Sequence, residues 1–223
     1  MTNAEMIAEN KRRLAALAEP YDPLVGTQHS EEIQRRPLTI KDALLPEQMV
    51  PVEMFDEPLV QALDSLHSLR KVASLAGVDE KEVWSDFEWL RCKYDFEFWT
   101  ATDVKILPKE GGNVVGFILN RPQRTRLLPA MEKLRKSDQP INIDLLKARQ
   151  WGGSTMVQFY IIWIQRFWKI GWNSAICGHV DKQSKVVLGM YERAVSHFDL
   201  RLNGFHPLTL DRYMGMDSTR TIK

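Results

Sequence analysis

The chain has 223 residues, of which 44% are hydrophobic, so it is long enough to bury the core of a globular protein. Its formal net charge of +1 excludes a strong overall field that would draw it to nucleic acid or to a membrane surface. Cys92 and Cys177 are the only cysteines, which excludes a disulfide framework and predicts two buried thiols. Residues 1–20 lack an apolar signal segment, and the longest apolar run, 159–164, is too short to span a bilayer. We therefore expect a cytoplasmic protein with no membrane partner.

Charge is distributed unevenly along the chain. Residues 47–103 carry 13 acidic and 5 basic side chains, whereas residues 121–149 carry 8 basic and 3 acidic ones. The basic stretch is where a polyphosphate would be attracted, although each side chain alone is equally consistent with a solvated helix face. Asp95, Glu97 and Asp103 of the acidic stretch are expected to be solvated or salt-bridged groups at the surface.

Residues 1–100 are expected to form a mainly helical N-terminal region. Apolar residues recur at helical spacing after Pro58, which suits the first turn of a helix, and Gly77 suits its end. Asp79 is a candidate N-cap for the next helix. In chain order, the predicted elements are a helix over 1–18, a loop over 21–51 with a short helix near 40–45, a helix over 58–76, and a helix from 79 to 94.

Residues 101–223 are expected to alternate between strands and helices. Glu110, Gly111 and Gly112 lie between two apolar stretches, a pattern that predicts a hairpin with a glycine turn. The predicted elements are strands over 105–108 and 113–119, a helix over 126–136, a buried strand over 141–146, a helix over 154–169, a strand over 173–180 and a helix over 184–198. The succession of strand, helix, strand and helix predicts a parallel sheet and an α/β fold class.

The most informative segment joins the predicted strand 141–146 to the helix that begins near Ser154. Gly152 and Gly153 allow the backbone to approach phosphate oxygens, and the N–H groups and dipole at a helix start favour an anion. In the G-x-x-x-x-G-K-[ST] pattern, Gly152 and Ser154 match the second glycine and the hydroxyl residue. Gly153 replaces the usual lysine, and Lys147 stands where the first glycine is expected. A lysine at that end can still place its ammonium group against the phosphates, and the Ser154 hydroxyl is suitably placed to coordinate Mg²⁺.

In this segment the chain resembles the large terminase subunits of tailed phages, which are ATPases that package DNA. Residues 147–155, KARQWGGST, are similar to their variant phosphate-binding loop, in which a Lys or Arg often lies at the start. Residues 117–124, FILNRPQR, are similar to the segment before their ATPase strand, where a Gln recognises adenine, and Gln123 matches that position. A carboxamide complements adenine N6 and N7, although on its own Gln123 would more readily be a surface residue. The resemblance covers the second half of the chain well and the first half loosely.

The resemblance implies a P-loop NTPase core within residues 101–223, made of a parallel sheet flanked by helices and incomplete in this chain. It implies ATP and Mg²⁺ as cofactors, with double-stranded DNA, the small terminase subunit and the portal as partners of the complete protein. The residues expected at the nucleotide are Lys147, Arg149, Gln150, Gly152, Gly153, Ser154, Thr155 and Gln123, and Ser154 is expected to bind the metal. Thr155 takes that role if the loop is shifted by one residue. Arg149 either touches phosphate or senses the nucleotide state, or else it faces solvent or forms a structural ion pair.

The chain departs from the family's pattern after the loop. No apolar run ending in acidic residues follows before Lys223, and the family's nuclease domain has no counterpart in the sequence. We therefore expect a piece of a longer protein that binds nucleotide without efficient turnover. Two alternatives stay open: a helicase-like P-loop ATPase, or a truncated, non-catalytic prophage protein that acts only by binding partners.

Overall fold

The structure is a computed structural model that describes residues 2–17, 21–28, 30–107, 111–146, 151–169, 171–175, 185, 188–192 and 213. Helices dominate these residues, and the strands form two small antiparallel sheets. The elements, in chain order, are α1 (Asn3–Leu17), β1 (Arg35–Thr39), β2 (Glu47–Pro51), the 3₁₀ helix η1 (Val52–Asp56), α2 (Pro58–Leu66), α3 (Leu69–Ala76), α4 (Glu80–Tyr94), α5 (Phe96–Thr102), β3 (Lys105–Ile106), β4 (Val115–Gly116), the π-helical turn η2 (Gln123–Leu127), α6 (Leu128–Lys136), α7 (Gly153–Trp163) and the π-helical turn η3 (Ile164–Trp168).

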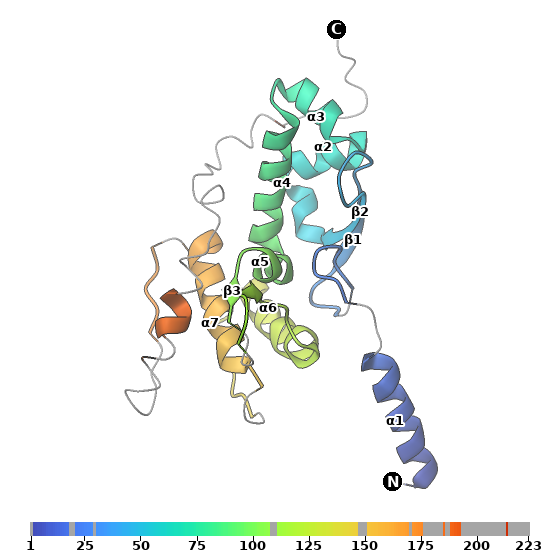
Figure 1. The fold of residues 1–223 in the computed structure, drawn as a ribbon, viewed down its shortest axis with the longest axis vertical. Helices are drawn as coiled ribbons and strands as arrows, with labels where there is room; N and C mark the ends of the chain where they lie inside the picture. Colours follow the sequence, from blue (N-terminus) through green and yellow to red (C-terminus); the bar gives the residue numbers. More distant parts are fainter. Residues whose placement is uncertain are drawn as a thin grey trace.

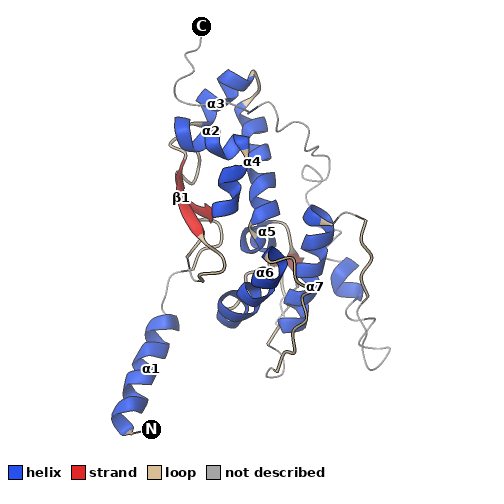
Figure 2. Cartoon of the chain, turned by 180° about the vertical axis from the view of Figure 1, so that it is seen from behind, coloured by secondary structure: helices blue, strands red, loops and turns tan. Residues whose placement is uncertain are grey.

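Most of these elements gather into one body, and α1 stands apart from it (Figure 1). Helices α2, α3 and the first part of α4 lie at one end of the body, and α5, α6 and α7 lie towards the other. The view from behind shows the β1 hairpin along one edge of a body built mainly from helices (Figure 2). The expected mixed α/β class is confirmed at this level, whereas the expected parallel sheet is not formed by the described residues.

A β-hairpin occupies the stretch for which the sequence predicts a loop with a short helix near 40–45. Strand β1 pairs antiparallel with β2 over five residue pairs, and the connection between them is a turn without a helix. Leu38, Gln48 and Val50 are buried on one face of the hairpin, and the polar residue Arg35 is buried on the other face. The prediction was wrong because polar residues take inward places that a simple alternation assigns to apolar ones.

The single helix predicted over 58–76 is two helices. His67 adopts a left-handed conformation with φ of 53° and ends α2, and Ser68 is the N-cap of α3. The Asp42 carboxylate, from the turn of the β1–β2 hairpin, accepts a hydrogen bond from the Leu69 N–H at 2.7 Å. The break is therefore fixed by a contact with a distant segment, which helical periodicity cannot reveal.

The hairpin and helices predicted after residue 101 are confirmed with changed ends. Strands β3 and β4 are shorter than expected, and a Cβ on Gly116 would lie 2.2 Å from the Ala101 carbonyl oxygen, so β4 packs closely on α5. Helices α6 and α7 correspond to the helices predicted over 126–136 and 154–169, and residues 188–192 are helical as expected. The expected division at residue 100 falls inside α5 and stays a prediction.

The buried strand predicted over 141–146 is not formed. The structure has no regular secondary structure there, and Leu146 is fully exposed, with Ile141 and Leu145 also exposed. A short apolar run fits a buried strand only where neighbouring strands pair with it, and among the described residues β1 pairs only with β2 and β3 only with β4. Of the second predicted strand, residues 173–175 are irregular and residues 176–180 lie outside the described residues.

The core is one continuous cluster of buried side chains. The Phe96 ring in α5 lies 5.4 Å from that of Tyr160 and 5.5 Å from that of Trp163, both in α7. The Trp163 indole N–H donates to the Cys92 carbonyl oxygen at 2.7 Å, which ties α7 to α4. Cys92 is buried as predicted, and Cys177 lies outside the described residues. These contacts hold α7, and with it the Gly152 turn, firmly on the rest of the body.

Candidate nucleotide-binding site

The turn that precedes α7 has the backbone geometry of an anion site. Gly152 is the N-cap of α7 with φ of 79°, in the left-handed region that glycine adopts without strain, and its carbonyl accepts from the Met156 N–H at 3.0 Å. As a glycine, Gly152 has no side chain with which to cap this end of the helix. The N–H groups of the first turn point away from the helix body, and the positive end of the helix dipole lies beside them.

Two carboxamides from residues 120–123 hold this turn. The Asn120 Nδ2 donates to the Trp151 carbonyl oxygen, and the Gln123 Nε2 donates to the Gly152 carbonyl oxygen, both at 3.0 Å. The two residues also bond each other: the Asn120 N–H donates to Gln123 Oε1 at 2.9 Å, and the Gln123 N–H donates to Asn120 Oδ1 at 3.1 Å. The structure therefore brings Asn120 and Gln123, from one of the two segments that resemble terminases, against Trp151 and Gly152 of the other.

The expected site residues differ in their exposure. Ser154 is exposed at the first turn of α7, Thr155 is half-buried beside it, and Gly153 is buried. An incoming phosphate or hydrated metal ion would therefore meet the Ser154 hydroxyl first. Lys147, Arg149 and Gln150 lie outside the described residues, so their predicted roles stay predictions.

Gln123 is not arranged as an adenine reader in this conformation. The residue is 1% exposed, its amide oxygen accepts from Asn120, and its amide nitrogen donates to Gly152. Recognition of adenine needs one donor and one acceptor of the carboxamide at the same time. Each atom already makes one hydrogen bond to the protein and the side chain is buried, so Gln123 would have to rearrange to contact a base. The sequence did not single out Asn120, although an Asn three residues before a Gln is a spacing at which side chains can cap each other's N–H groups.

Much of the basic stretch that begins at Arg121 is engaged with the protein. The Arg124 guanidinium lies 4.1 Å from the centre of the Tyr21 ring, Arg135 forms an ion pair with Glu132 at 2.7 Å, and Lys136 pairs with Glu53. These contacts reduce the positive charge that residues 121–136 present to a ligand. The two ion pairs therefore offset part of the expected attraction for polyphosphate.

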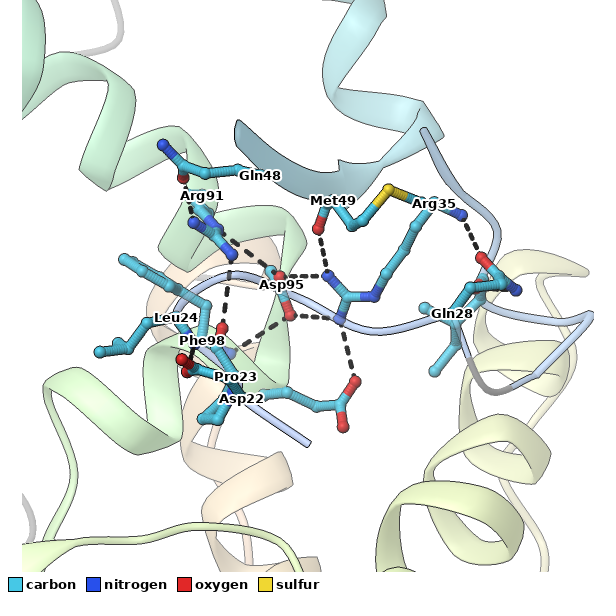
Figure 3. Close-up of polar contacts among 12 residues, drawn as sticks. Asp22, Pro23, Leu24, Gln28, Arg35, Gln48, Met49, Arg91, Asp95 and Phe98 are labelled. Atoms are coloured by element: carbon cyan, nitrogen blue, oxygen red, sulfur yellow. Dashed lines mark hydrogen bonds and ion pairs between the residues drawn. The ribbon is translucent and has the colours of Figure 1, made fainter. Parts of the chain in front are cut away.

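A buried ionic cluster lies between the β1–β2 hairpin and the α4–α5 junction, and Figure 3 shows three of its members, Arg35, Arg91 and Asp95. Glu97, which is bonded to Arg35, is the fourth. Arg35 donates two hydrogen bonds to Asp95, at 2.6 and 2.8 Å, and one to Glu97 at 2.9 Å. Arg91 lies 3.7 Å from Asp95 and donates to Gln48. Asp95 and Glu97 are both 2% exposed, so the prediction that they are surface groups was wrong.

Asp103, predicted to be another surface carboxylate, is also buried. It accepts from the Trp99 indole N–H at 2.9 Å, and Arg166 lies 3.5 Å from it. Because a buried charge is costly unless it is paired, the burial of Asp95 and Asp103 depends on Arg35 and Arg166, which are distant in sequence. No local pattern in the sequence marks these two pairs.

Within the ionic cluster, Arg35 and Asp95 hold each other in the charged form, whereas burial lowers the pKa of Arg91 to about 10. Burial alone would raise the pKa of Asp95, but the positive charge and hydrogen bonds of Arg35, together with Arg91, lower that pKa below its ordinary value. Burial alone would lower the pKa of Arg35, but Asp95 and Glu97 raise it above its ordinary value. The adjoining cavity, lined in part by Arg35, Glu97 and Lys136, has a volume of about 10 Å³, enough for one water molecule. The ionic cluster is therefore a structural element with no room for a nucleotide.

Comparison with protein-family models, curated proteins and solved structures gives no match to this chain. The described residues also contain no group of three or more His, Cys, Asp or Glu side chains placed to hold a metal ion. Across the described ranges, no helix combines the length and the apolar character needed to cross a bilayer.

Proposed function

We propose that this chain is the ATP-binding part of a motor that packages double-stranded DNA, with Mg-ATP bound at the Gly152 turn. The observation that carries the proposal is the contact of Asn120 and Gln123 with the carbonyls of Trp151 and Gly152. The resemblance assigns these two segments, some thirty residues apart, to one nucleotide site. Asn120 and Gln123 of the first segment contact Trp151 and Gly152 of the second at the start of α7, where the N-cap Gly152 has no side chain.

Each group at the Gly152 turn would contribute to nucleotide binding in a different way. The N–H groups of Gly152, Gly153 and the first turn of α7 would donate to phosphate oxygens, and Lys147 would neutralise their charge. The exposed Ser154 hydroxyl would ligate Mg²⁺. The water-activating glutamate and the parallel-sheet core of a P-loop motor would involve residues of the complete protein. Hydrolysis there would drive DNA translocation in concert with the small terminase subunit and the portal.

Calorimetric titration of the purified chain with Mg-ATP tests the proposal. We expect saturable binding that Lys147→Ala weakens at least about tenfold, because a charge-assisted contact contributes roughly 1.5–3 kcal/mol. Ser154→Ala is expected to weaken binding in Mg²⁺ and to have little effect in EDTA. Lys133→Ala is the matched control, since it removes one positive charge from an exposed residue of the same basic stretch.

The outcomes distinguish specific binding of the nucleotide at the loop from non-specific attraction by positive charge. Equal weakening by Lys147→Ala and Lys133→Ala would mean that binding is a non-specific charge effect. Absence of binding by the folded chain would refute the proposal and favour the alternative of a non-catalytic protein that acts through partners.

A further inference from the structure

The carboxamides of Asn120 and Gln123 act on the peptide groups that would face phosphate. Asn120 holds the Trp151 carbonyl and Gln123 holds the Gly152 carbonyl, each at 3.0 Å. In a trans peptide the C=O and the N–H point in opposite directions. Fixing these two carbonyls therefore fixes the directions of the Gly152 and Gly153 N–H groups, which point to the other side of the turn.

The turn is built around the absence of a side chain at position 152. A Cβ there would lie 2.9 Å from the Gln123 Nε2, a separation that real Cβ atoms essentially never show. The φ of 79° independently disfavours every residue with a Cβ. Glycine at this position thus serves both the backbone conformation and the close approach of the Gln123 amide.

Asn120 and Gln123 also hold each other's side chains in place. Each uses its side-chain oxygen to accept the other's backbone N–H, at 2.9 and 3.1 Å, which leaves both NH₂ groups directed at the turn. Gln123 is buried, so its rotamer is held by packing as well as by hydrogen bonds. Such support is what a binding constellation needs if it is to be preorganised.

We propose that Asn120 and Gln123 are positioning residues that aim the Gly152 and Gly153 N–H groups at a phosphate of the bound nucleotide. Gln123 then acts on the phosphate end of the ligand and does not select the base. This inference rests on the proposed nucleotide site and deepens it. If the two residues act only on the phosphate end of the ligand, they support the binding of ATP, GTP and tripolyphosphate alike.

The test uses variants that replace only the donor group. Gln123→Glu and Asn120→Asp keep the oxygens that accept from the two backbone N–H groups, but they place a carboxylate oxygen opposite a carbonyl. We expect each to weaken the binding of Mg-ATP, Mg-GTP and Mg-tripolyphosphate by a similar factor, about 3- to 10-fold, which corresponds to one lost hydrogen bond. Asn120 is exposed, so Asn120→Asp tests the idea even if Gln123→Glu does not fold.

Gln165→Glu is the matched control. The Gln165 Nε2 also donates to a tryptophan carbonyl, that of Trp172 at 2.6 Å, but at the other end of α7. This variant is expected to leave the affinity for all three ligands unchanged. Loss of ATP binding alone in Gln123→Glu, with GTP and tripolyphosphate unaffected, would overturn the positioning role and support a base-reading one.

Hydrogen exchange distinguishes failure of this inference from failure of the nucleotide site. Without ligand, amides of residues 151–157 are expected to exchange faster in Gln123→Glu and Asn120→Asp than in the parent or in Gln165→Glu. Unchanged exchange would overturn the positioning contacts whatever the protein binds. If exchange is faster in the two variants but the parent chain binds none of the three ligands, the phosphate role is overturned and the contacts are a purely structural device.

Discussion

Replacing Asp95 with asparagine tests whether the buried ionic cluster stabilises the fold. Asp95 receives two hydrogen bonds from Arg35, and both side chains are nearly fully buried. Arg91, equally buried, lies on its other side. Asp95→Asn keeps the shape of the side chain and removes one of two negative charges that balance two positive ones.

The magnitude follows from the burial of these charges. Removing one partner of a buried ion pair leaves an uncompensated charge and costs about 3–5 kcal/mol, a large part of the roughly 5–15 kcal/mol by which domains are stable. Asp95 is also the N-cap of α5, where its Oδ1 accepts from the Phe98 N–H at 3.2 Å. Asparagine caps a helix about as well as aspartate, so the loss reports the charge and not the cap.

Urea unfolding followed by the fluorescence of the seven tryptophans provides the assay. The control is Asp64→Asn, which breaks the ion pair with Arg36, whose side chain is 52% exposed. That exposed pair is expected to contribute no more than about 1 kcal/mol. A loss for Asp95→Asn that is no larger than the loss for Asp64→Asn would refute the reasoning about the ionic cluster.

The pH dependence gives an independent check on the same residue. Because the pKa of Asp95 is lowered in the folded protein, its contribution is fully present above its unfolded pKa of about 3.9 and is lost as the pH falls through its folded pKa. The difference in unfolding free energy between the parent and Asp95→Asn is therefore expected to shrink as the pH is lowered below about 4. A difference that stays constant down to pH 2 would show that Asp95 does not act through its charge.

Two further substitutions test other contacts by urea unfolding. Gly152→Ala is expected to lower the unfolding free energy more than Gly77→Ala: both place a Cβ on a left-handed residue, at about 1–2 kcal/mol, but only at Gly152 does that Cβ meet another group. Equal losses would mean that the Gln123 amide moves aside at little cost. Tyr213→Phe is expected to cost about 1.5–3 kcal/mol, because the Tyr213 hydroxyl donates to the buried Asp86 carboxylate at 2.6 Å. An unchanged unfolding free energy would show that this hydrogen bond does not stabilise the chain.

Local rules in the sequence located several helices and their ends. Asp79 was predicted as an N-cap, and its side chain accepts from the Lys81 N–H at 2.7 Å. Gly77 was predicted to end a helix, and it does so with φ of 70°. Caps and apolar periodicity depend on residues within one or two turns of each other, so their physics is contained in a short stretch of sequence.

The candidate site was predictable in part. The two glycines before a helix are a local signal, and Gly152 and the start of α7 lie where the sequence places them. That Gln123 is buried against the Gly152 carbonyl was not predictable, because its partner lies 29 residues away. In the folded protein the Gln123 amide oxygen accepts from the Asn120 N–H, and its amide nitrogen donates to the Gly152 carbonyl oxygen.

What the sequence by itself determined is therefore the placement of most helices, the glycine hairpin and the glycine turn before α7. Only the tertiary structure decided that residues 141–146 stay unpaired, that Asp42 breaks the helix predicted over 58–76, and that Asp95 is buried against Arg35, 60 residues away. The physical reason is that a strand, a buried charge or a distant cap is stable only with a partner from elsewhere in the chain. A local pattern specifies which groups need such partners, and the fold determines which partners they receive.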